Sequence, residues 1–268
     1  MTKTVTLQDA EGHLVKREVS ESALSSDAAE RGKFKHFMLK EIYEQPKTIL
    51  DAMRGRISSK ESRVTLRGME EYANRFVRAN RIIIVACGTS YHSGLIGEYL
   101  IEDLARIPVE VEYASEFRYR NPILSERDIV IAISQSGETA DTMAALELAK
   151  QKGAMIYGIV NSVGSSIARL TDAGSYIHAG PEIGVASTKA FTGQVTVLTL
   201  LALSLARKLS TISNTYFQTL VRELELIPSM VEEILKENDH IKYIAKEVKD
   251  HHNALYLGRG YNFPVALE

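Results

Sequence analysis

The residues best suited to chemistry lie in three short polar loops, each of which follows an apolar run. The loop of residues 134–139 is the most informative, because six positions hold three hydroxyls, an amide and a glycine in the order Ser134, Gln135, Ser136, Gly137, Glu138, Thr139. Backbone N–H groups and hydroxyls in such a loop can donate hydrogen bonds to a phosphate. The loop lacks the lysine of a P-loop, so it favours a phosphomonoester over a nucleoside triphosphate. An elaborate N-cap of the next helix is the alternative interpretation.

The first loop, Cys87-Gly88-Thr89-Ser90, follows the apolar run of residues 81–86. Its glycine permits close backbone approach, and its two hydroxyls could bind an anion at the start of a helix. Capping of that helix would explain the same hydroxyls equally well. Cys87 is the only cysteine, so no intrachain disulfide can form, which favours a reducing cytoplasm. The small size of a cysteine, which suits the tight end of a strand, explains the presence of Cys87 as well as thiol reactivity does.

The third loop, residues 182–189, opens a long apolar helix. We expect Gly184 to loosen its backbone, and Ser187 or Thr188 to cap the helix. Lys189 could be interpreted as a nucleophile, but a lysine in the first turn of a helix is usually a solvated charge. We therefore assign Lys189 no catalytic role.

The elements around these loops predict an α/β fold. Strand-like runs at residues 81–86, 109–114, 128–133, 155–160 and 175–179 indicate five strands, and helical patterns separate them. The runs at 81–86, 128–133 and 155–160 are mainly apolar. Strands that are apolar throughout are typical of an open parallel sheet flanked by helices on both faces. Ligands of such sheets bind beyond the carboxyl ends of the strands, where the three loops would converge.

The segments on either side of the sheet region are less regular. The first thirty residues alternate as a strand would, with a hairpin turn at Gly12, and then become a polar linker. Residues 35–53 and 215–252 have helical spacing, and we expect breaks at Pro46 and Pro228. Residues 253–260 predict another strand and glycine-rich turn, which would begin a further unit extending past the end of the chain.

The composition excludes several classes of protein. The 268 residues include 32 Lys and Arg and 34 Asp and Glu, so the net charge is −2 and nothing indicates nucleic-acid binding. The N-terminus lacks the pattern of a signal or transit peptide. The longest apolar stretch, residues 195–206, is too short to cross a membrane and predicts a buried helix. The pair His251-His252 lacks a third ligand at metal spacing, so we expect no metal and no cofactor.

Several segments resemble the isomerase half of the glutamine:fructose-6-phosphate aminotransferase family, the glucosamine-6-phosphate synthases. They are ACGTS, ISQSGETADT, EIGVASTKAF and LGRG in that order, with KEIYEQP and ASEFRYR in support. The resemblance runs from about Phe34 and implies a sugar-isomerase (SIS) fold. It implies the glutaminase tail and linker at 1–34, a helical lead-in at 35–74, the first SIS domain at 75–210, connecting helices at 211–252, and the start of a second SIS domain at 253–268.

The same resemblance implies a site for fructose 6-phosphate or glucosamine 6-phosphate. The family's phosphate-binding loop matches Ser134, Gln135, Ser136 and Thr139. Its first sugar-phosphate loop matches Cys87, Gly88, Thr89 and Ser90. Its third loop, beside the sugar, matches Val185, Ala186 and Ser187. Glu268 matches a glutamate that opens the family's catalytic stretch, and we name it as a candidate catalytic residue.

The family transfers ammonia from glutamine to fructose 6-phosphate and isomerises the product, which begins the hexosamine pathway. Its glutaminase cysteine would follow Met1, where Thr2 stands. Its ring-opening histidine, its proton-shuttling glutamate and its imine-forming lysine would all fall beyond Glu268, so we expect these 268 residues to bind phosphosugar without turning it over. The dimeric isomerase half of the family and the long apolar helix at 188–209 suggest a homodimer.

Two alternatives remain open. One is a non-catalytic SIS module that senses a phosphosugar and regulates a partner. The other is a sugar isomerase or deglycase with the same fold. No basic helix-turn-helix pattern precedes the sheet region, which disfavours a DNA-binding regulator. The segments ASTKAF and KEIYEQP favour the synthase over both alternatives.

Overall fold

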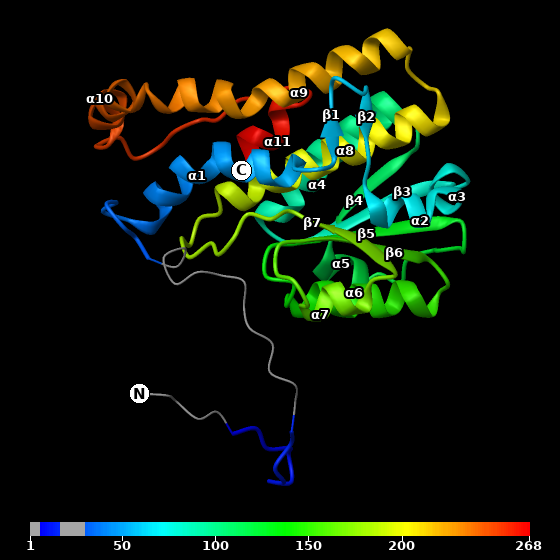
Figure 1. Cartoon of the computed structure of the whole chain (residues 1–268). Helices are drawn as coiled ribbons and strands as arrows, with labels where there is room; N and C mark the ends of the chain where they lie inside the picture. Colours follow the sequence, from blue (N-terminus) through cyan, green and yellow to red (C-terminus); the bar gives the residue numbers. More distant parts are fainter. Residues whose placement is uncertain (1–5, 17–29) are drawn as a thin grey trace.

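The centre of the molecule is a five-stranded parallel sheet in the order β4-β3-β5-β6-β7 (Figure 1). It is seen in a computed structural model that describes residues 6–16 and 30–268. The strands are β3 (Arg81–Ala86), β4 (Val109–Tyr113), β5 (Asp128–Ser134), β6 (Met155–Val160) and β7 (Ala173–Tyr176). The predicted α/β fold with five parallel strands is confirmed.

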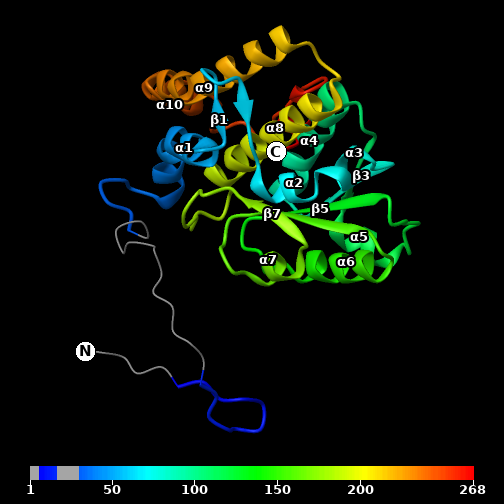
Figure 2. The same cartoon turned by 45° about the vertical axis from the view of Figure 1, so that its right-hand side comes forward.

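Helices cover both faces of this sheet, as the two views show (Figures 1 and 2). On one face lie α1 (Phe37–Met53), α4 (Thr89–Ala105) and α8 (Lys189–Leu209), with α9 (Asn214–Leu235) packed against α1. On the other lie α5 (Ala114–Tyr119), α6 (Ala140–Gln151) and α7 (Ser166–Leu170). Alternate residues of each strand therefore face different cores, for example Ile84 toward the first layer and Val85 toward the second. The double cover explains why the central strands are apolar on both faces.

The remaining short elements lie outside the sheet. A small hairpin, β1 (Ile57–Ser58) and β2 (Arg63–Val64), and the helices α2 (Arg67–Glu71) and α3 (Ala73–Val77) connect α1 to β3. After α9 the chain forms α10 (Asn238–Val248) and α11 (Asn262–Leu267). Of these, α11 packs against α4.

The apolar helix α8 is a core helix, as the sequence predicted. Among the described residues it is the one helix long and apolar enough to cross a membrane, and 78% of its most apolar window is buried inside the molecule. It packs mainly against α4 and α1. At Gly97 of α4 a Cβ would lie 2.9 Å from a methyl group of Leu198, so this glycine permits the close approach of the two helices.

Both expected proline breaks were wrong. Helix α1 is continuous through Pro46, and α9 is continuous through Pro228. Proline removes the N–H that would bond the carbonyl four residues earlier. In α1 the side-chain amide of Gln45 supplies a substitute, because its Nε2 donates to the carbonyl oxygen of Ile42 at 3.1 Å.

The expected strand at residues 253–260 was also wrong. The structure has no strand there, and Leu255, Tyr256 and Leu257 are exposed. A strand needs a neighbour for its backbone groups, and no described strand lies beside this segment. Near the N-terminus, the expected hairpin reduces to a single antiparallel bridge between Gln8 and Leu14 around the turn. The predicted polar linker falls largely on residues 17–29, outside the described residues.

Candidate functional site

A pocket of about 200 Å³ opens at the carboxyl ends of β3 and β5. All three loops predicted from the sequence contribute to its wall. The lining residues are Cys87, Thr89, Ser90, Ile133, Ser134, Gln135, Ser136, Thr139 and Ser187. The structure therefore brings together eight of the predicted site residues at one place. Of the others, Gly88 lies beside them as the N-cap of α4, while Val185 and Ala186 are exposed neighbours of Ser187.

The loop of residues 134–139 is folded around the hydroxyl of Ser134. The Ser134 Oγ accepts the backbone N–H of Gly137 at 3.0 Å and lies 3.2 Å from the Thr139 Oγ1. The Oγ of Ser136 accepts the backbone N–H of Glu138 at 3.2 Å. The structure does not favour the alternative of an N-cap, because Thr139 occupies the N-cap of α6 but makes no side-chain capping hydrogen bond.

Helix α7 supports this loop from behind. The backbone N–H of Ile167 donates to the carbonyl of Gly137 at 2.9 Å, and that of Ser166 donates to Glu138 Oε1 at 2.8 Å. The hydroxyl of Ser166, followed by its backbone N–H, lowers the pKa of Glu138. Gly137 has a φ of +68°, and a Cβ at this position would overlap the side chain of Ser165. The turn therefore requires glycine for both its conformation and its close approach to α7.

The first loop is connected to α8 by buried amide and hydroxyl groups. The Gln194 side chain, which is buried, donates from Nε2 to Ser90 Oγ at 2.9 Å and accepts from Ser93 Oγ at 2.9 Å. Neither Thr89 nor Ser90 caps α4, whose N-cap is Gly88. Sequence reasoning missed Gln194, although a single amide within the apolar run of α8 was the available signal.

Glu268 lies behind the first loop rather than in the pocket wall. Its Oε1 accepts the hydroxyl of Thr89 at 2.7 Å, and its Oε2 lies 2.6 Å from Nδ1 of His92. The candidate catalytic carboxylate thus contacts a residue that lines the pocket. Its catalytic role stays a prediction. His92, which sequence reasoning missed, links the start of α4 to the end of the chain.

The expectation that Lys189 is a solvated charge was wrong. Lys189 is 3% exposed, and its Nζ lies 2.7 Å from Glu44 Oε2 of α1. A buried ammonium needs an anionic partner, and the partner comes from the KEIYEQP segment, 145 residues away in the sequence. The expected cap position is confirmed, because Thr188 is the N-cap of α8. Its side chain makes no capping hydrogen bond, and the carboxylate of Glu182 instead accepts the backbone N–H of Thr188 at 2.9 Å.

The pocket wall carries no formal charge. Among the described residues that line it, the polar groups are hydroxyls, one amide and one thiol. Helices α4 and α6 begin beside the pocket, so their positive ends favour an anion there. An anion in this site would be held by backbone N–H groups and hydroxyls, which is how helix N-termini bind phosphate. No carboxylate and no imidazole lies among the described lining residues, so the donors of this wall suit an anion better than a metal cation.

One cluster of possible metal ligands lies elsewhere, in the segment 6–16. Asp9, Glu11 and His13 place their ligand atoms within 4.8 Å of one another, and all three are exposed. Asp9 Oδ1 accepts the backbone N–H groups of Glu11 and His13 at 3.0 and 2.8 Å. The N–H of His13 contributes most to lowering the pKa of Asp9. Hydrogen bonds within the turn account for this cluster.

Comparisons with known proteins agree with this fold. Residues 75–204 match the family model of the SIS domain. The chain is 61% identical over 251 residues to a protein of Bacteroides thetaiotaomicron named glutamine–fructose-6-phosphate aminotransferase [isomerizing], over 94% of this chain and 41% of that protein. It is 62% identical to the protein of the same name from Chlorobaculum tepidum, with the same shares covered.

A solved structure gives the same result. The C-terminal domain of glucosamine-fructose-6-phosphate aminotransferase from Francisella tularensis superposes with a TM-score of 0.83 at 36% identity, over 88% of this chain and 66% of that one. The five-stranded parallel sheet and the polar pocket at its carboxyl edge thus define an SIS-domain protein. The chain belongs to the glutamine–fructose-6-phosphate aminotransferase family, and it spans 41% of the length of the curated relatives named above.

Proposed function

We propose that the pocket at β3 and β5 binds the phosphate end of fructose 6-phosphate or glucosamine 6-phosphate. The observation that carries the proposal is the convergence of three loops on one uncharged, hydroxyl-rich pocket in a chain 61% identical to an isomerizing aminotransferase. The hydroxyls of Ser134, Ser136 and Thr139 would donate to phosphate oxygens, with backbone N–H groups of the same loop.

The reaction that this site would serve is the transfer of glutamine-derived ammonia to C2 of fructose 6-phosphate, followed by isomerisation to glucosamine 6-phosphate. Within it, the residues described here would bind and orient the sugar. A phosphate held rigidly at the non-reacting end of the sugar aligns C1 and C2 with the reacting groups, which converts binding energy into rate. The glutaminase activity and the acid, base and imine-forming groups of the whole enzyme would lie outside these 268 residues.

The proposal extends to the setting of the protein. A single cysteine, which forms no intrachain disulfide, and the proposed metabolic role support a cytoplasmic location. We propose that the intact enzyme is a homodimer that also carries a glutaminase domain. A phosphosugar-sensing regulator is not favoured, because the relatives at 61% and 62% identity are named as enzymes.

Calorimetric titration of the purified chain tests the binding. Fructose 6-phosphate and glucosamine 6-phosphate should bind saturably in a phosphate-free buffer, and unphosphorylated fructose should not. The Ser134→Ala variant should weaken binding by about 5- to 150-fold, the equivalent of about 1 to 3 kcal/mol for a hydrogen bond to a charged group.

Ser229→Ala is the matched control, because its hydroxyl donates to the carbonyl of Leu226 on the exposed side of α9. This variant should bind like the original chain. Equal binding of fructose and fructose 6-phosphate would reject the phosphate-binding role, and unchanged affinity in Ser134→Ala would reject the role of its hydroxyl.

A further inference from the structure

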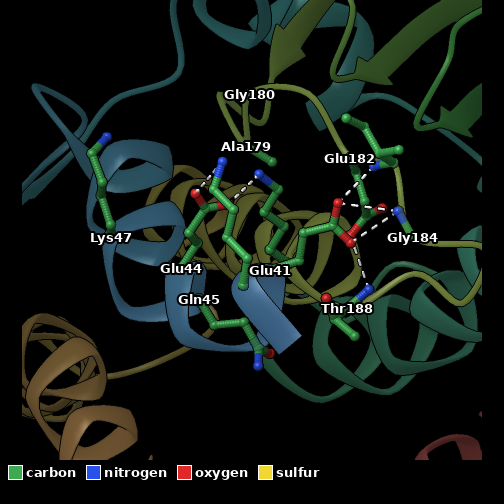
Figure 3. Close-up of polar contacts among 12 residues, drawn as sticks. Glu41, Glu44, Gln45, Lys47, Ala179, Gly180, Glu182, Gly184 and Thr188 are labelled. Atoms are coloured by element: carbon green, nitrogen blue, oxygen red, sulfur yellow. Dashed lines mark hydrogen bonds and ion pairs between the residues drawn. The ribbon is translucent and has the colours of Figure 1, made fainter. Parts of the chain in front are cut away.

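A buried carboxylate of α1 holds the third loop of the pocket in place. Glu41 is 2% exposed. Its Oε1 accepts the backbone N–H of Ile183 at 2.6 Å, and both of its carboxylate oxygens lie 3.1 Å from the backbone nitrogen of Gly184 (Figure 3). Burying a carboxylate is costly unless hydrogen bonds replace its hydration, and hydrogen bonds to a charged acceptor are the strong ones. The contact therefore fixes this part of the loop to a residue more than 140 positions earlier.

The close approach of Glu41 explains the glycine in this loop. A Cβ on Gly184 would lie 2.5 Å from Glu41 Oε2 and 3.3 Å from the Cα of Met38. The φ of Gly184 is not among the positive values in the chain, so the position does not need glycine for its backbone conformation. That Gly184 also loosens the backbone stays a prediction. Its role is to leave room for the carboxylate.

The other end of the loop is held by Glu182. Its Oε2 accepts the hydroxyl of Ser187 at 2.9 Å, and its Oε1 accepts the backbone N–H groups of Thr188 and Ala190 at 2.9 and 3.1 Å. Ser187 lines the pocket. The segment that carries Ser187 is thus held between two carboxylates, Glu41 on its N-terminal side and Glu182 on its C-terminal side (Figure 3).

We propose that Glu41 is a positioning residue of the phosphosugar site, which acts by fixing residues 183–187 against the pocket. This inference rests on the proposed function, because it assigns the third loop to the sugar. The loop of residues 134–139 is folded by its own hydrogen bonds and by α7, and Glu41 contacts none of them. Loss of the Glu41 carboxylate should therefore weaken contacts to the sugar and leave the phosphate contacts intact.

Amide hydrogen exchange, measured by NMR on the 268-residue chain, tests the positioning directly and needs no ligand. In Glu41→Ala the amides of Ile183 and Gly184 should exchange at least about tenfold faster, because each loses its charged acceptor. The amide of Gly137 should not change. Unchanged exchange at Ile183 and Gly184, or equal acceleration at Gly137, would overturn the proposal.

Binding is measured in the same variants with two probes, fructose 6-phosphate and inorganic phosphate. Glu41→Ala should lower the affinity for fructose 6-phosphate about tenfold and leave that for inorganic phosphate unchanged. Glu41→Gln, which keeps one acceptor oxygen, should recover part of the loss. Gln45→Ala is the control, because it perturbs α1 at Pro46 without reaching the loop.

The two binding results separate this inference from the proposed function. If the original chain binds neither probe, the proposed function fails, while amide exchange still decides whether Glu41 fixes the loop. If Glu41→Ala weakens both probes equally, or if Gln45→Ala has the same effect, Glu41 stabilises the fold only, and the positioning role is rejected.

Discussion

At the scale of single residues, the loop of residues 134–139 depends on a glycine as much as on hydroxyls. Gly137 has a φ of +68°, and its position faces Ser165, whose buried hydroxyl has no hydrogen-bond partner among the described residues. Gly164 also has a positive φ, +71°, but nothing lies within 4 Å of a Cβ built there. Gly137 and Gly164 share a positive φ, but only Gly137 lies too close to a neighbour for a Cβ. Substitutions at the two positions therefore separate the cost of backbone strain from the cost of steric overlap.

We therefore predict that Gly137→Ala damages the site more than Gly164→Ala does. Both variants should lose stability from a strained φ, by about 1 kcal/mol or more. Only Gly137→Ala should also displace Ser165 and lower the affinity for fructose 6-phosphate by more than about tenfold. Urea denaturation and calorimetry measure the two effects. Similar loss of affinity in both variants would contradict the overlap argument.

At the scale of elements, the strands of the sheet were predicted well and the helices around prolines were not. The strand signal is local, since runs such as IIIVA in β3 and IVIAI in β5 are apolar at every position. At Pro46 of α1, where the helix continues, the side-chain amide of Gln45 replaces the missing backbone N–H, and the sequence pattern does not reveal this replacement. The residues 253–260 carry a strand pattern without a neighbouring strand, so their structure is decided by tertiary context.

Within the sheet, Tyr157 of β6 predicts a loss of stability at alkaline pH. Burial raises its pKa to about 12. Its hydroxyl lies 2.8 Å from Ser175 Oγ on the neighbouring strand. An unfolded tyrosine titrates near pH 10. The protonated form is therefore favoured in the folded state, and its contribution is fully present below pH 10 and is lost as the pH rises through about 12.

The size of this effect follows from the shift of about two units, which corresponds to about 2 to 3 kcal/mol when fully lost. Urea denaturation between pH 9 and 11.5 should show a steeper decline for the original chain than for Tyr157→Phe. The variant gives a constant offset from the unpaired Ser175 hydroxyl, which does not depend on pH in this range. Parallel declines would show that Tyr157 does not titrate as its burial requires.

At the scale of the whole molecule, the sequence predicted the loops of the site, but it did not predict the residues that hold these loops in place. The hydroxyls of residues 134–139 are visible in sequence because they are contiguous. Glu41 and Glu44 of α1 act on residues 183, 184 and 189, and Gln194 acts on Ser90, over separations of more than 100 residues. Only the fold places these partners together, so composition and local spacing could not have identified which residue each of them contacts.

The end of the chain extends the same principle, because Glu268 connects α11 to the pocket through Thr89 and His92. Beyond this contact, Tyr261 at the N-cap of α11 contacts α4, because its hydroxyl lies 3.4 Å from Asp103 Oδ2. A short helix of six residues has little stability of its own, so its position depends on these contacts.

We predict that Glu268→Ala raises amide exchange in residues 262–268 about tenfold while exchange in β3 and β5 stays unchanged. Glu268→Gln should have a smaller effect, because its amide oxygen can still accept from the Thr89 hydroxyl. Equal exchange in Glu268→Ala and the original chain would show that α11 is held by its apolar contacts alone, and the carboxylate would then be free for a role in the pocket.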